Sequence, residues 1–444
     1  MTATSVREVP GVVLVGSPTT SVQGECNRGG EPIPGAVLVA ESLGPELYEA
    51  IVVSAAVVCA RGGRTGHMQS LCRSRGIPVL RVAPAELGSL VGEVTVRLDR
   101  ESVLLGAAVP APRAPGPAPA RLDEVDSVCV VVADATDVRA VNALSPRVAQ
   151  VDSYFIREEF ACLSAELSPF DALRSGVAGA RRYGAALADE LCGMLAELLP
   201  GQRLVMRLLD LRSDDAAQIT TGVPVEGEPN PELGLHGARW LLAEENYPHA
   251  FRALRGRLRE LVGPAADRVS FAVPFINDRD EFERLRAHLG LGAGTPLGVF
   301  VETPAAVHST AEFCVAGASE LFVGTKDLIQ FYLAADRGNH LVAATYQTRH
   351  PAVLAALRHA VTAGRGGGVP VHVFALGADV EHYVRRLPTR RLMMCTAELR
   401  QVALAAAERA AAERAAGERA AGERVAGERV AAGQVAGEPV AAAG

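Results

Sequence analysis

The sequence predicts an α/β protein, built as a (β/α)8 barrel of the TIM type that is preceded by a small α/β domain. Eight strand-like apolar runs, each followed by a helical or loop stretch, recur over about 280 residues, and such barrels typically need about 250. Four further β-rich runs come before them, and a proline-dense segment separates the two groups. A chain of 444 residues has room for two such domains and a tail.

The first domain is predicted over residues 1–106. Its strand-like runs are "GAVLVA" (35–40), "AAVVCA" (55–60), "IPVLRV" (77–82) and "EVTVRL" (93–98), and they alternate with helical stretches. A compact α/β domain of about a hundred residues follows from this pattern.

Two low-complexity segments divide the chain. Residues 107–122 contain "AAVPAPRAPGPAPA", whose prolines favour an extended, semi-rigid linker. Residues 401–444 repeat "ER" at 408, 413, 418, 423 and 428 among small residues. A five-residue period fits neither a helix nor a heptad, which predicts a disordered tail and not a coiled coil.

The barrel is predicted over residues 123–400. Its eight runs are Val128–Ala133, Val151–Phe155, Leu204–Leu209, Val269–Pro274, Leu297–Glu302, Leu321–Gly324, Pro370–Phe374 and Arg391–Cys395. Periodicity alone leaves a doubly wound sheet open as an alternative.

Charge and cysteine usage exclude several classes of protein. The net charge of −7 argues against a nucleic-acid or anionic-membrane surface, because both need a basic footprint. Eight scattered cysteines without a CxxC pair indicate reduced thiols, as in a cytoplasm. No apolar run approaches the ~20 residues of a membrane-spanning helix, and no signal peptide is recognisable, so a cytoplasmic protein is expected.

Charged side chains follow the predicted barrel strands, where the βα loops of such a barrel build its site. They are Arg157 after the second run, Arg207 in the third, Glu302 at the end of the fifth, Lys326 and Asp327 after the sixth, and Arg337 slightly further on. Arginine forks bind phosphate or carboxylate bidentately, and carboxylate oxygens hold Mg²⁺. The set predicts a site for a multiply charged anion and a hard cation.

Lys326 is the single lysine among the 44 basic residues of the chain. Its neighbours in "VGTKDLIQ" belong to the predicted site, which favours a chemical role over a chance survival. An ammonium ~4 Å from a phosphate oxygen contributes on the order of 4 kcal/mol of gross attraction at an effective dielectric of about 20.

In the first domain, "RGGRTGHMQSLCRSRGIPVL" places His67 where a helix is predicted to begin, after a glycine-rich turn. The helix dipole disfavours a cationic imidazole there. The same position suits a phosphorylated histidine, since free backbone N–H groups would meet the phosphoryl oxygens and Arg64 could pair with them.

These motifs together resemble the phosphoenolpyruvate-utilising enzymes, the family of Enzyme I of the sugar phosphotransferase system, phosphoenolpyruvate synthase and pyruvate phosphate dikinase. The resemblance rests on "GGRTGHMQSLCRSRGIPVL", "FIREEF", "VMRLLDL", "NPELGLHGAR", "VETPAAV", "VGTKDLIQFYLAADRGN" and "YQTRHPAVL", in family order over about residues 30–398.

The resemblance implies that the first domain is a swivelling phosphohistidine domain and the barrel binds phosphoenolpyruvate. It implies that His67 is phosphorylated, that Glu302 and Asp327 bind Mg²⁺, and that the protein is a homodimeric transferase of kinase type. The implied substrate contacts are Arg157, Arg207, Arg337, Lys326, Arg239 and His236.

Four departures from the family pattern stand out, and one of them involves two positions. Gly66 stands where the family has a serine, and His236 where it has an arginine. Asp215 replaces a lysine, while Lys326 replaces an asparagine, so one cation is lost and another gained. Val373 or Phe374 occupies the place of the cysteine that protonates the enolate, and neither can donate a proton. Cys395 lies at the same predicted barrel face, although a buried structural thiol is the more common role.

The expected function is transfer of a phosphoryl group from phosphoenolpyruvate to His67 and then to an unknown acceptor. There is no Gly-rich nucleotide-binding domain, so independent use of ATP is not expected, and no helical insertion for a carrier protein precedes His67. Two alternatives remain: a barrel enzyme for a related phosphorylated or carboxylated enol, and a degenerate binding or regulatory protein.

Overall fold

The computed structural model describes residues 7–16, 21–62, 67–106, 125–144, 151–219, 224–292, 294–337, 342, 344–376, 379–396 and 398–399. For residues 45, 67, 70, 144 and 217–219 it describes the backbone alone. The predicted linker (107–122) and tail (401–444) therefore lie outside the described residues. No helix within the described ranges is both long and apolar enough to cross a membrane.

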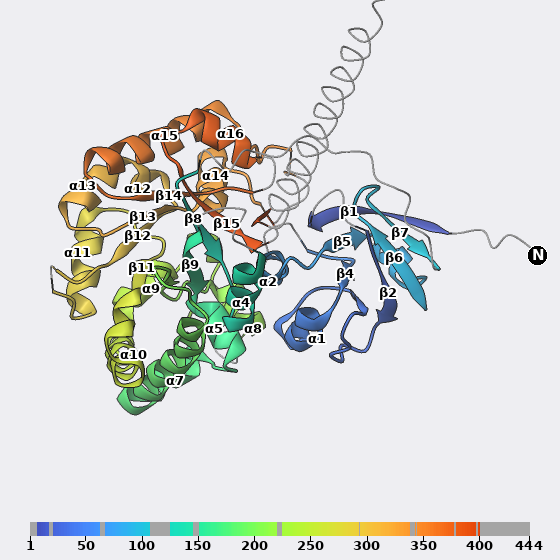
Figure 1. The fold of residues 1–444 in the computed structure, drawn as a ribbon, viewed down its shortest axis with the longest axis horizontal. Helices are drawn as coiled ribbons and strands as arrows, with labels where there is room; N and C mark the ends of the chain where they lie inside the picture. Colours follow the sequence, from blue (N-terminus) through green and yellow to red (C-terminus); the bar gives the residue numbers. More distant parts are fainter. Residues whose placement is uncertain are drawn as a thin grey trace, which may run out of the picture.

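The first domain is a small closed sheet with helices beside it (Figure 1). Its strands are β1 (Glu8–Val15), β2 (Ser21–Asn27), β3 (Val37–Ala40), β4 (Ala56–Cys59), β5 (Val79–Val82), β6 (Glu93–Arg97) and β7 (Ser102–Leu105), in the order β1-β5-β4-β3-β2-β6-β7. β2 to β5 pair in parallel, and the other pairings are antiparallel. The four predicted runs correspond to β3, β4, β5 and β6.

The helical elements of this domain are short. They are a 3₁₀ turn (Pro45–Leu47), α1 (Tyr48–Val53), α2 (His67–Arg75) and α3 (Pro84–Leu87). Leu71 and Cys72 of α2 are fully buried, and they belong to the same apolar cluster as the outer layer of the barrel. The helix that begins at His67 therefore packs between the two domains.

The second domain is a closed barrel of eight parallel strands, which confirms the predicted fold class. The strands are β8 (Ser127–Val131), β9 (Val151–Arg157), β10 (Arg203–Arg207), β11 (Val269–Val273), β12 (Gly298–Val301), β13 (Leu321–Val323), β14 (Val371–Phe374) and β15 (Arg391–Cys395). Each pairs in parallel with its neighbours, and β15 pairs with β8 to close the ring. The eight predicted runs match the eight strands.

Helices surround the barrel (Figure 1). They are α4 (Ala135–Leu144), α5 (Glu158–Ser164), α6 (Pro169–Arg174), α7 (Gly176–Ala196), α8 (Ser213–Ile219), α9 (Gly237–Ala243), α10 (Tyr247–Val262), α11 (Arg279–His288), α12 (Pro304–His308), α13 (Thr310–Val315), α14 (Thr325–Leu333), α15 (Pro351–Gly366) and α16 (Asp379–Arg386), with 3₁₀ turns at Pro231–Leu233 and Gly263–Arg268.

Aromatic rings fill the inside of the barrel. Phe155, Phe300 and Phe322 come from three strands, and their ring centroids lie 5.1 to 6.0 Å apart. Phe374 and Cys395 belong to the same interior cluster. Large interior side chains make the barrel a packed core and not a pore, so chemistry is confined to its ends.

A buried ion network closes the N-terminal end of the barrel. Arg203 begins β10 and donates from Nη1 to Glu320 Oε2 at 2.6 Å, while His372 Nε2 lies 2.6 Å from Glu320 Oε1. Burial alone would raise the pKa of Glu320, but the contacts with His372 and Arg203 outweigh it and lower that pKa to about 2.

We expect Glu320→Gln to lower the unfolding free energy by about 3 kcal/mol at neutral pH. This figure is the lowering of the Glu320 pKa from its ordinary value to about 2, converted at ~1.4 kcal/mol per pKa unit. Because the folded pKa is depressed, the stabilisation is present above pH ~4.5 and is lost as the pH falls towards 2. Urea unfolding should therefore show a larger loss at pH 7 than at pH 3.5. Glu260→Gln, at an exposed acid of α10, is the control, and an equal loss at both pH values would contradict the prediction.

Candidate active site

The charged side chains predicted to form a site do follow the strands at one end of the barrel. Arg157 and Arg207 are the last residues of β9 and β10, and Glu302 directly follows β12. Lys326 and Asp327 lie in the first turn of α14, after β13. Because all eight strands are parallel, these positions share the C-terminal face, where (β/α)8 enzymes hold their sites.

Arg207 is the centre of an ion cluster on this face. Its guanidinium lies 2.5 Å from Glu159, 3.1 Å from Asp210 and 3.5 Å from Glu302. Burial would lower the pKa of Arg207, but the three carboxylates hold it above its usual range. The side chain is therefore a fixed cation whose partners are already in place.

Arg157 is different, because among the described residues no carboxylate lies within ion-pair distance of it. Its buried Nε has no hydrogen-bond partner, and its guanidinium lies 5.5 Å from the centre of the Phe160 ring. Burial, followed by the charge of Arg207, lowers the pKa of Arg157. Arg157 is half-buried. A guanidinium that is partly removed from water without a counter-ion is costly, and an anionic ligand would supply the counter-ion that the described residues do not.

The two predicted metal ligands are held by neighbouring groups. Glu302 Oε2 accepts a hydrogen bond from the Phe275 N–H at 3.0 Å, and Asp327 Oδ1 lies 2.9 Å from Arg337 Nη1. Burial raises the pKa of Glu302 to about 7, and the charge of Asp327 adds to the rise. Phe275 holds this geometry with a φ of +51°, a strained conformation for a bulky residue.

Gly324 makes room for Glu302. A Cβ at this position would stand 2.6 Å from Glu302 Cγ, closer than real side-chain contacts allow. Glycine therefore lets the chain between β13 and α14 pass directly beside the carboxylate, which brings Asp327 towards it.

Lys326 is buried and lies against an aromatic ring. Its Nζ is 5.0 Å from the centre of the Phe374 ring, within the range of a cation–π contact. Burial, together with the charges of Arg157 and Arg337, lowers the pKa of Lys326 to about 7. The lysine thus shares one region with the unpaired Arg157 and with the end of β15.

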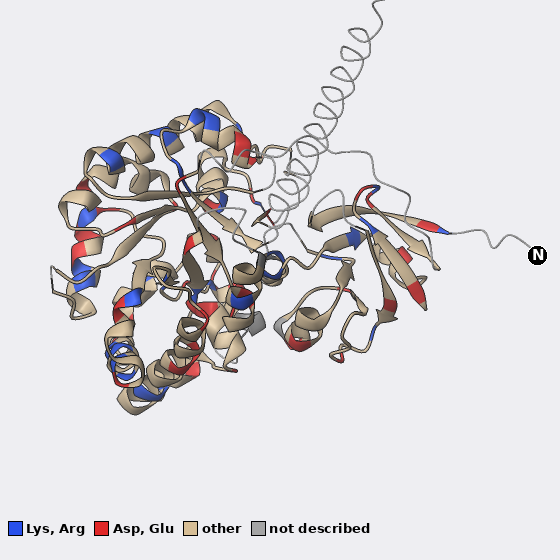
Figure 2. Cartoon of the chain, viewed as in Figure 1, with Lys and Arg blue, Asp and Glu red and all other residues tan. Residues whose placement is uncertain are grey.

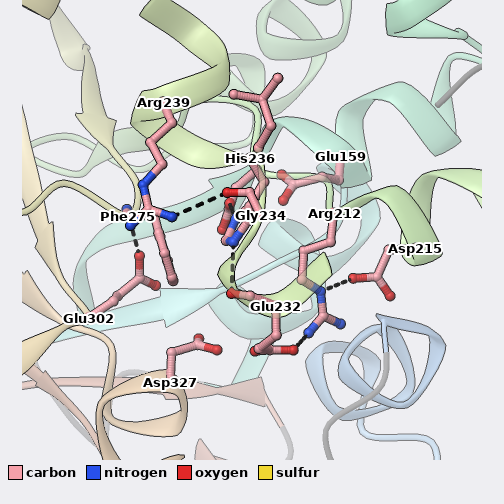
Figure 3. A network of polar contacts seen from close by, with 12 residues as sticks. Glu159, Arg212, Asp215, Glu232, Gly234, His236, Arg239, Phe275, Glu302 and Asp327 are labelled. Carbon is pink, nitrogen blue, oxygen red and sulfur yellow. Dashed lines mark hydrogen bonds and ion pairs between the residues drawn. The ribbon is translucent and has the colours of Figure 1, made fainter. Parts of the chain in front are cut away.

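His236 and Arg239 belong to a polar network beside these groups (Figure 3). His236 Nδ1 lies 2.7 Å from Asp210 Oδ1 and its Nε2 lies 3.1 Å from the carbonyl of Glu232. Arg239 Nη1 donates to the carbonyls of Leu233 and Gly234, and its guanidinium lies 5.5 Å from the Phe275 ring centre. Both ring nitrogens of His236 thus contact protein groups. We infer that His236 positions Asp210.

Asp215 is not an isolated loss of charge. Arg212 Nε donates to Asp215 Oδ2 at 2.6 Å, and Arg212 also forms an ion pair with Glu232 (Figure 3). The positive charge of Arg337 repels that of Arg212, whereas the negative charge of Asp215 attracts Arg337. The guanidinium of Arg212 therefore lies beside Asp215, the position where the family resemblance implies a lysine.

Comparison with known proteins identifies both parts of the chain. Residues 154–381, just over half of the chain, match the PEP-binding domain of PEP-utilising enzymes, where PEP is phosphoenolpyruvate. Residues 32–102 match the mobile domain of the same enzymes. The chain belongs to the PEP-utilising enzymes.

Similar PEP-utilising proteins include synthases and phosphotransferases. A probable phosphoenolpyruvate synthase of Archaeoglobus fulgidus is 28% identical over 370 residues, covering 80% of this chain and 47% of the relative. A phosphoenolpyruvate-protein phosphotransferase of Haloferax volcanii is 29% identical over 404 residues, covering 84% and 67%. The chain thus spans about half the length of the matched synthase.

The carboxylates fit the Mg²⁺ that the PEP-utilising family implies. Among the described residues no group of three or more His, Cys, Asp and Glu side chains is arranged to hold a metal. Mg²⁺ needs only one or two carboxylates, since it retains waters and takes further oxygens from phosphate. Burial is the main cause of the raised pKa of Glu302, and repulsion from Asp327 adds to it. A cation between the two carboxylates would relieve that repulsion.

The mobile domain of this PEP-utilising protein is docked on the C-terminal face of the barrel. Arg73 of α2 lies 3.3 Å from Glu398, after β15, and donates to the carbonyl of Leu14 at 3.0 Å. Arg75 forms an ion pair with Asp134, after β8. The side chain of His67, at the other end of α2, lies outside the described residues.

We expect Glu398→Gln to weaken this docking, because it removes the charge that pairs with buried Arg73; breaking a buried pair costs about 3–5 kcal/mol. Small-angle scattering should show a larger radius of gyration for the variant than for the wild type. Glu381→Gln, which removes an exposed partner of Arg385, should leave the profile unchanged. Identical profiles for Glu398→Gln and the wild type would show that the pair does not hold the domain.

Some residues of the site were not predicted from the sequence. Glu159 and Asp210, the closest acids to Arg207, lie inside the quoted motifs "FIREEF" and "VMRLLDL". The signal was present, since Asp210 is three residues after Arg207 and Glu159 two after Arg157. Phe275 gave no signal, because its contribution is a backbone N–H.

Proposed function

We propose that this PEP-utilising enzyme transfers the phosphoryl group of phosphoenolpyruvate to His67 and then to a second molecule. The observation that carries the proposal is the half-buried Arg157, which has no carboxylate partner among the described residues, beside Arg207, Lys326 and two carboxylates, on the barrel face where α2 docks. Phosphoenolpyruvate carries both a phosphate and a carboxylate. Its charge would give Arg157 and Lys326 the counter-ions that the described residues do not provide.

In the proposed reaction, the bond between phosphorus and the enol oxygen breaks and a bond from phosphorus to a ring nitrogen of His67 forms. The electron pair of the broken bond stays on the enol oxygen. Arg157, Arg207 and Lys326 stabilise the charge that spreads over the phosphoryl oxygens, because they are fixed in a site of low dielectric. Mg²⁺ held by Glu302 and Asp327 would neutralise phosphate charge when bound.

The enolate left by this step must gain a proton at carbon to become pyruvate. Phe374 cannot supply it. Cys395 ends β15, and burial, together with the charge of Glu398, raises the pKa of its thiol to about 12, although nearby Lys326 opposes the rise. We propose this protonated thiol as the donor on the same face.

The test is phosphorylation with labelled phosphoenolpyruvate and Mg²⁺. We expect an acid-labile, base-stable phosphoprotein, and His67→Ala should abolish the label. His308→Ala, at an exposed histidine of α12, should retain it. An unlabelled wild type, or a labelled His67→Ala protein, would contradict the proposal.

We also propose a homodimer and a cytosolic location. The family resemblance supports the dimer. All eight cysteines are free in the structure, which agrees with a reducing compartment.

A further inference from the structure

A second cluster of arginines lies at the opposite end of the barrel from the candidate active site. A cavity of about 490 Å³ opens there between the starts of β14 and β15 and the ends of α15 and α16. Arg365, Arg390 and Arg391 line it, together with Asp126 and apolar residues such as Leu387. Its volume is in the range of small-molecule sites, about 300–1,000 Å³.

Rigid elements build this cavity. The N–H groups of Asp126 and Ser127 donate to the carbonyl of Arg390 at 2.8 and 3.3 Å, which fixes the chain just before β15 to the chain before β8. Arg365, in the last turn of α15, donates from Nη1 to the carbonyl of Pro388 at 2.6 Å. The guanidinium is thereby held at the cavity wall and retains its other N–H donors.

The charge of the described lining residues is positive. Among them, three guanidiniums stand beside one carboxylate, that of Asp126. Outside the described lining, Arg391 Nη1 lies 3.9 Å from Asp152 Oδ2, close to the limit of an ion pair. In a chain of net charge −7 such a local excess is not a general property of the surface. Basic positions recur along neighbouring α15 and α16 (Figure 2).

Arginine at the end of a helix also complements the helix dipole. That explanation applies to Arg365 but not to Arg390 and Arg391, which precede and begin a strand. The sequence "RRLPTRR" (385–391) thus brings its second arginine pair into the cavity for a reason other than helix stability.

We propose that this cavity is a binding site for a small phosphorylated anion, separate from the substrate site. Guanidinium forks bind phosphate oxygens bidentately, and three arginines line this one partly enclosed space. The two sites lie at opposite ends of the same strand, since Arg391 begins β15 and Cys395 ends it. At about 3.3 Å per residue the ends of this strand stand about 13 Å apart, too far for one small phosphate to contact both.

The test uses Arg157→Met as background, so that anion binding at the substrate site is weakened, and EDTA to remove metal. Calorimetry with pyrophosphate should show one site per chain. Adding Arg365→Gln, Arg390→Gln and Arg391→Gln should weaken that binding at least tenfold. Parallel titrations with inorganic phosphate and glucose 6-phosphate decide between a free anion and a phosphate ester as the preferred ligand.

Two outcomes would overturn the inference: no pyrophosphate binding in the Arg157→Met background, or equal affinity with and without the three cavity arginines. Circular dichroism must show that the triple variant is folded. If it is not, Arg365→Gln alone, at an exposed side chain, must weaken binding at least threefold. In the wild-type background the cavity variants should keep the rate of His67 phosphorylation, because they do not touch the substrate site.

Discussion

Replacing Arg157 by methionine is expected to lower the rate of His67 phosphorylation about 100- to 1,000-fold, while the free energy of unfolding stays unchanged or rises. This loss of rate is typical of removing one preorganised group that stabilises the charge of a transition state. Stability is spared because Arg157 has no carboxylate partner within the described residues, and both burial and the charge of Arg207 oppose its ionisation. Methionine fills much of the same space without the charge.

The measurement pairs single-turnover phosphorylation with urea unfolding of the same preparation. Arg174→Met, at an exposed arginine of α6, controls for the loss of any arginine and should change neither quantity by a measurable amount. If Arg157→Met lowered stability by more than 1 kcal/mol, the guanidinium would have a structural partner. If the rate were unchanged, Arg157 would not contact the phosphoryl group.

The strands of the barrel were predictable because a parallel strand is buried on both faces and gives a continuous apolar run. β13 is "LFV" and β14 is "VHVF", and both are fully buried. In the first domain, β1 ("EVPGVVLV") and β2 ("SVQGECN") were missed. Their pairing with β7 and β6 is antiparallel, their buried residues are interrupted by exposed ones, and glycine lies within each. Such strands are stabilised by partners distant in the sequence.

The positions of the site residues were predictable, but their partners were not. The end of a barrel strand can be read from a local apolar run, so Arg157, Arg207 and Glu302 could be placed at one face. The pairing of Arg207 with Glu159 joins residues 48 apart, and it depends on the parallel register of β9 and β10. No local pattern encodes that register.

Two departures from the family pattern meet in the structure. By the family resemblance, Lys326 replaces an asparagine, and Val373 or Phe374 takes the place of the proton-donating cysteine. In the structure, the Nζ of Lys326 lies 5.0 Å from the centre of the Phe374 ring. The ring packs inside the barrel and offers the buried ammonium the negative face of its π-system. Since Lys326 and Phe374 are in contact, a substitution of one changes the surroundings of the other. A test of specificity should therefore replace both residues together.

Arg207→Met is expected to have the largest effect on stability, in contrast with Arg157→Met. It removes the cation shared by Glu159, Asp210 and Glu302, of which two are buried and Asp210 is half-buried, at a cost of about 3–5 kcal/mol. In the wild type, burial would raise the pKa of Asp210, but Arg207 and His236 hold it well below its usual range. Without Arg207 the pKa values of the three acids rise, and the protonated forms become favoured in the folded state.

The sign of the pH dependence follows from these shifts. A carboxyl whose folded pKa is raised stabilises the fold below its unfolded pKa, and that stabilisation is lost as the pH rises through the folded value. Urea unfolding should therefore give a larger difference between Arg207→Met and wild type at pH 8 than at pH 5.5. Adding Glu159→Gln should recover part of the loss at pH 8, since it removes one of the uncompensated charges. A loss below 1 kcal/mol, or one that is independent of pH, would mean that water or a rearranged cation replaces the guanidinium, and Arg207 would then be a substrate contact only.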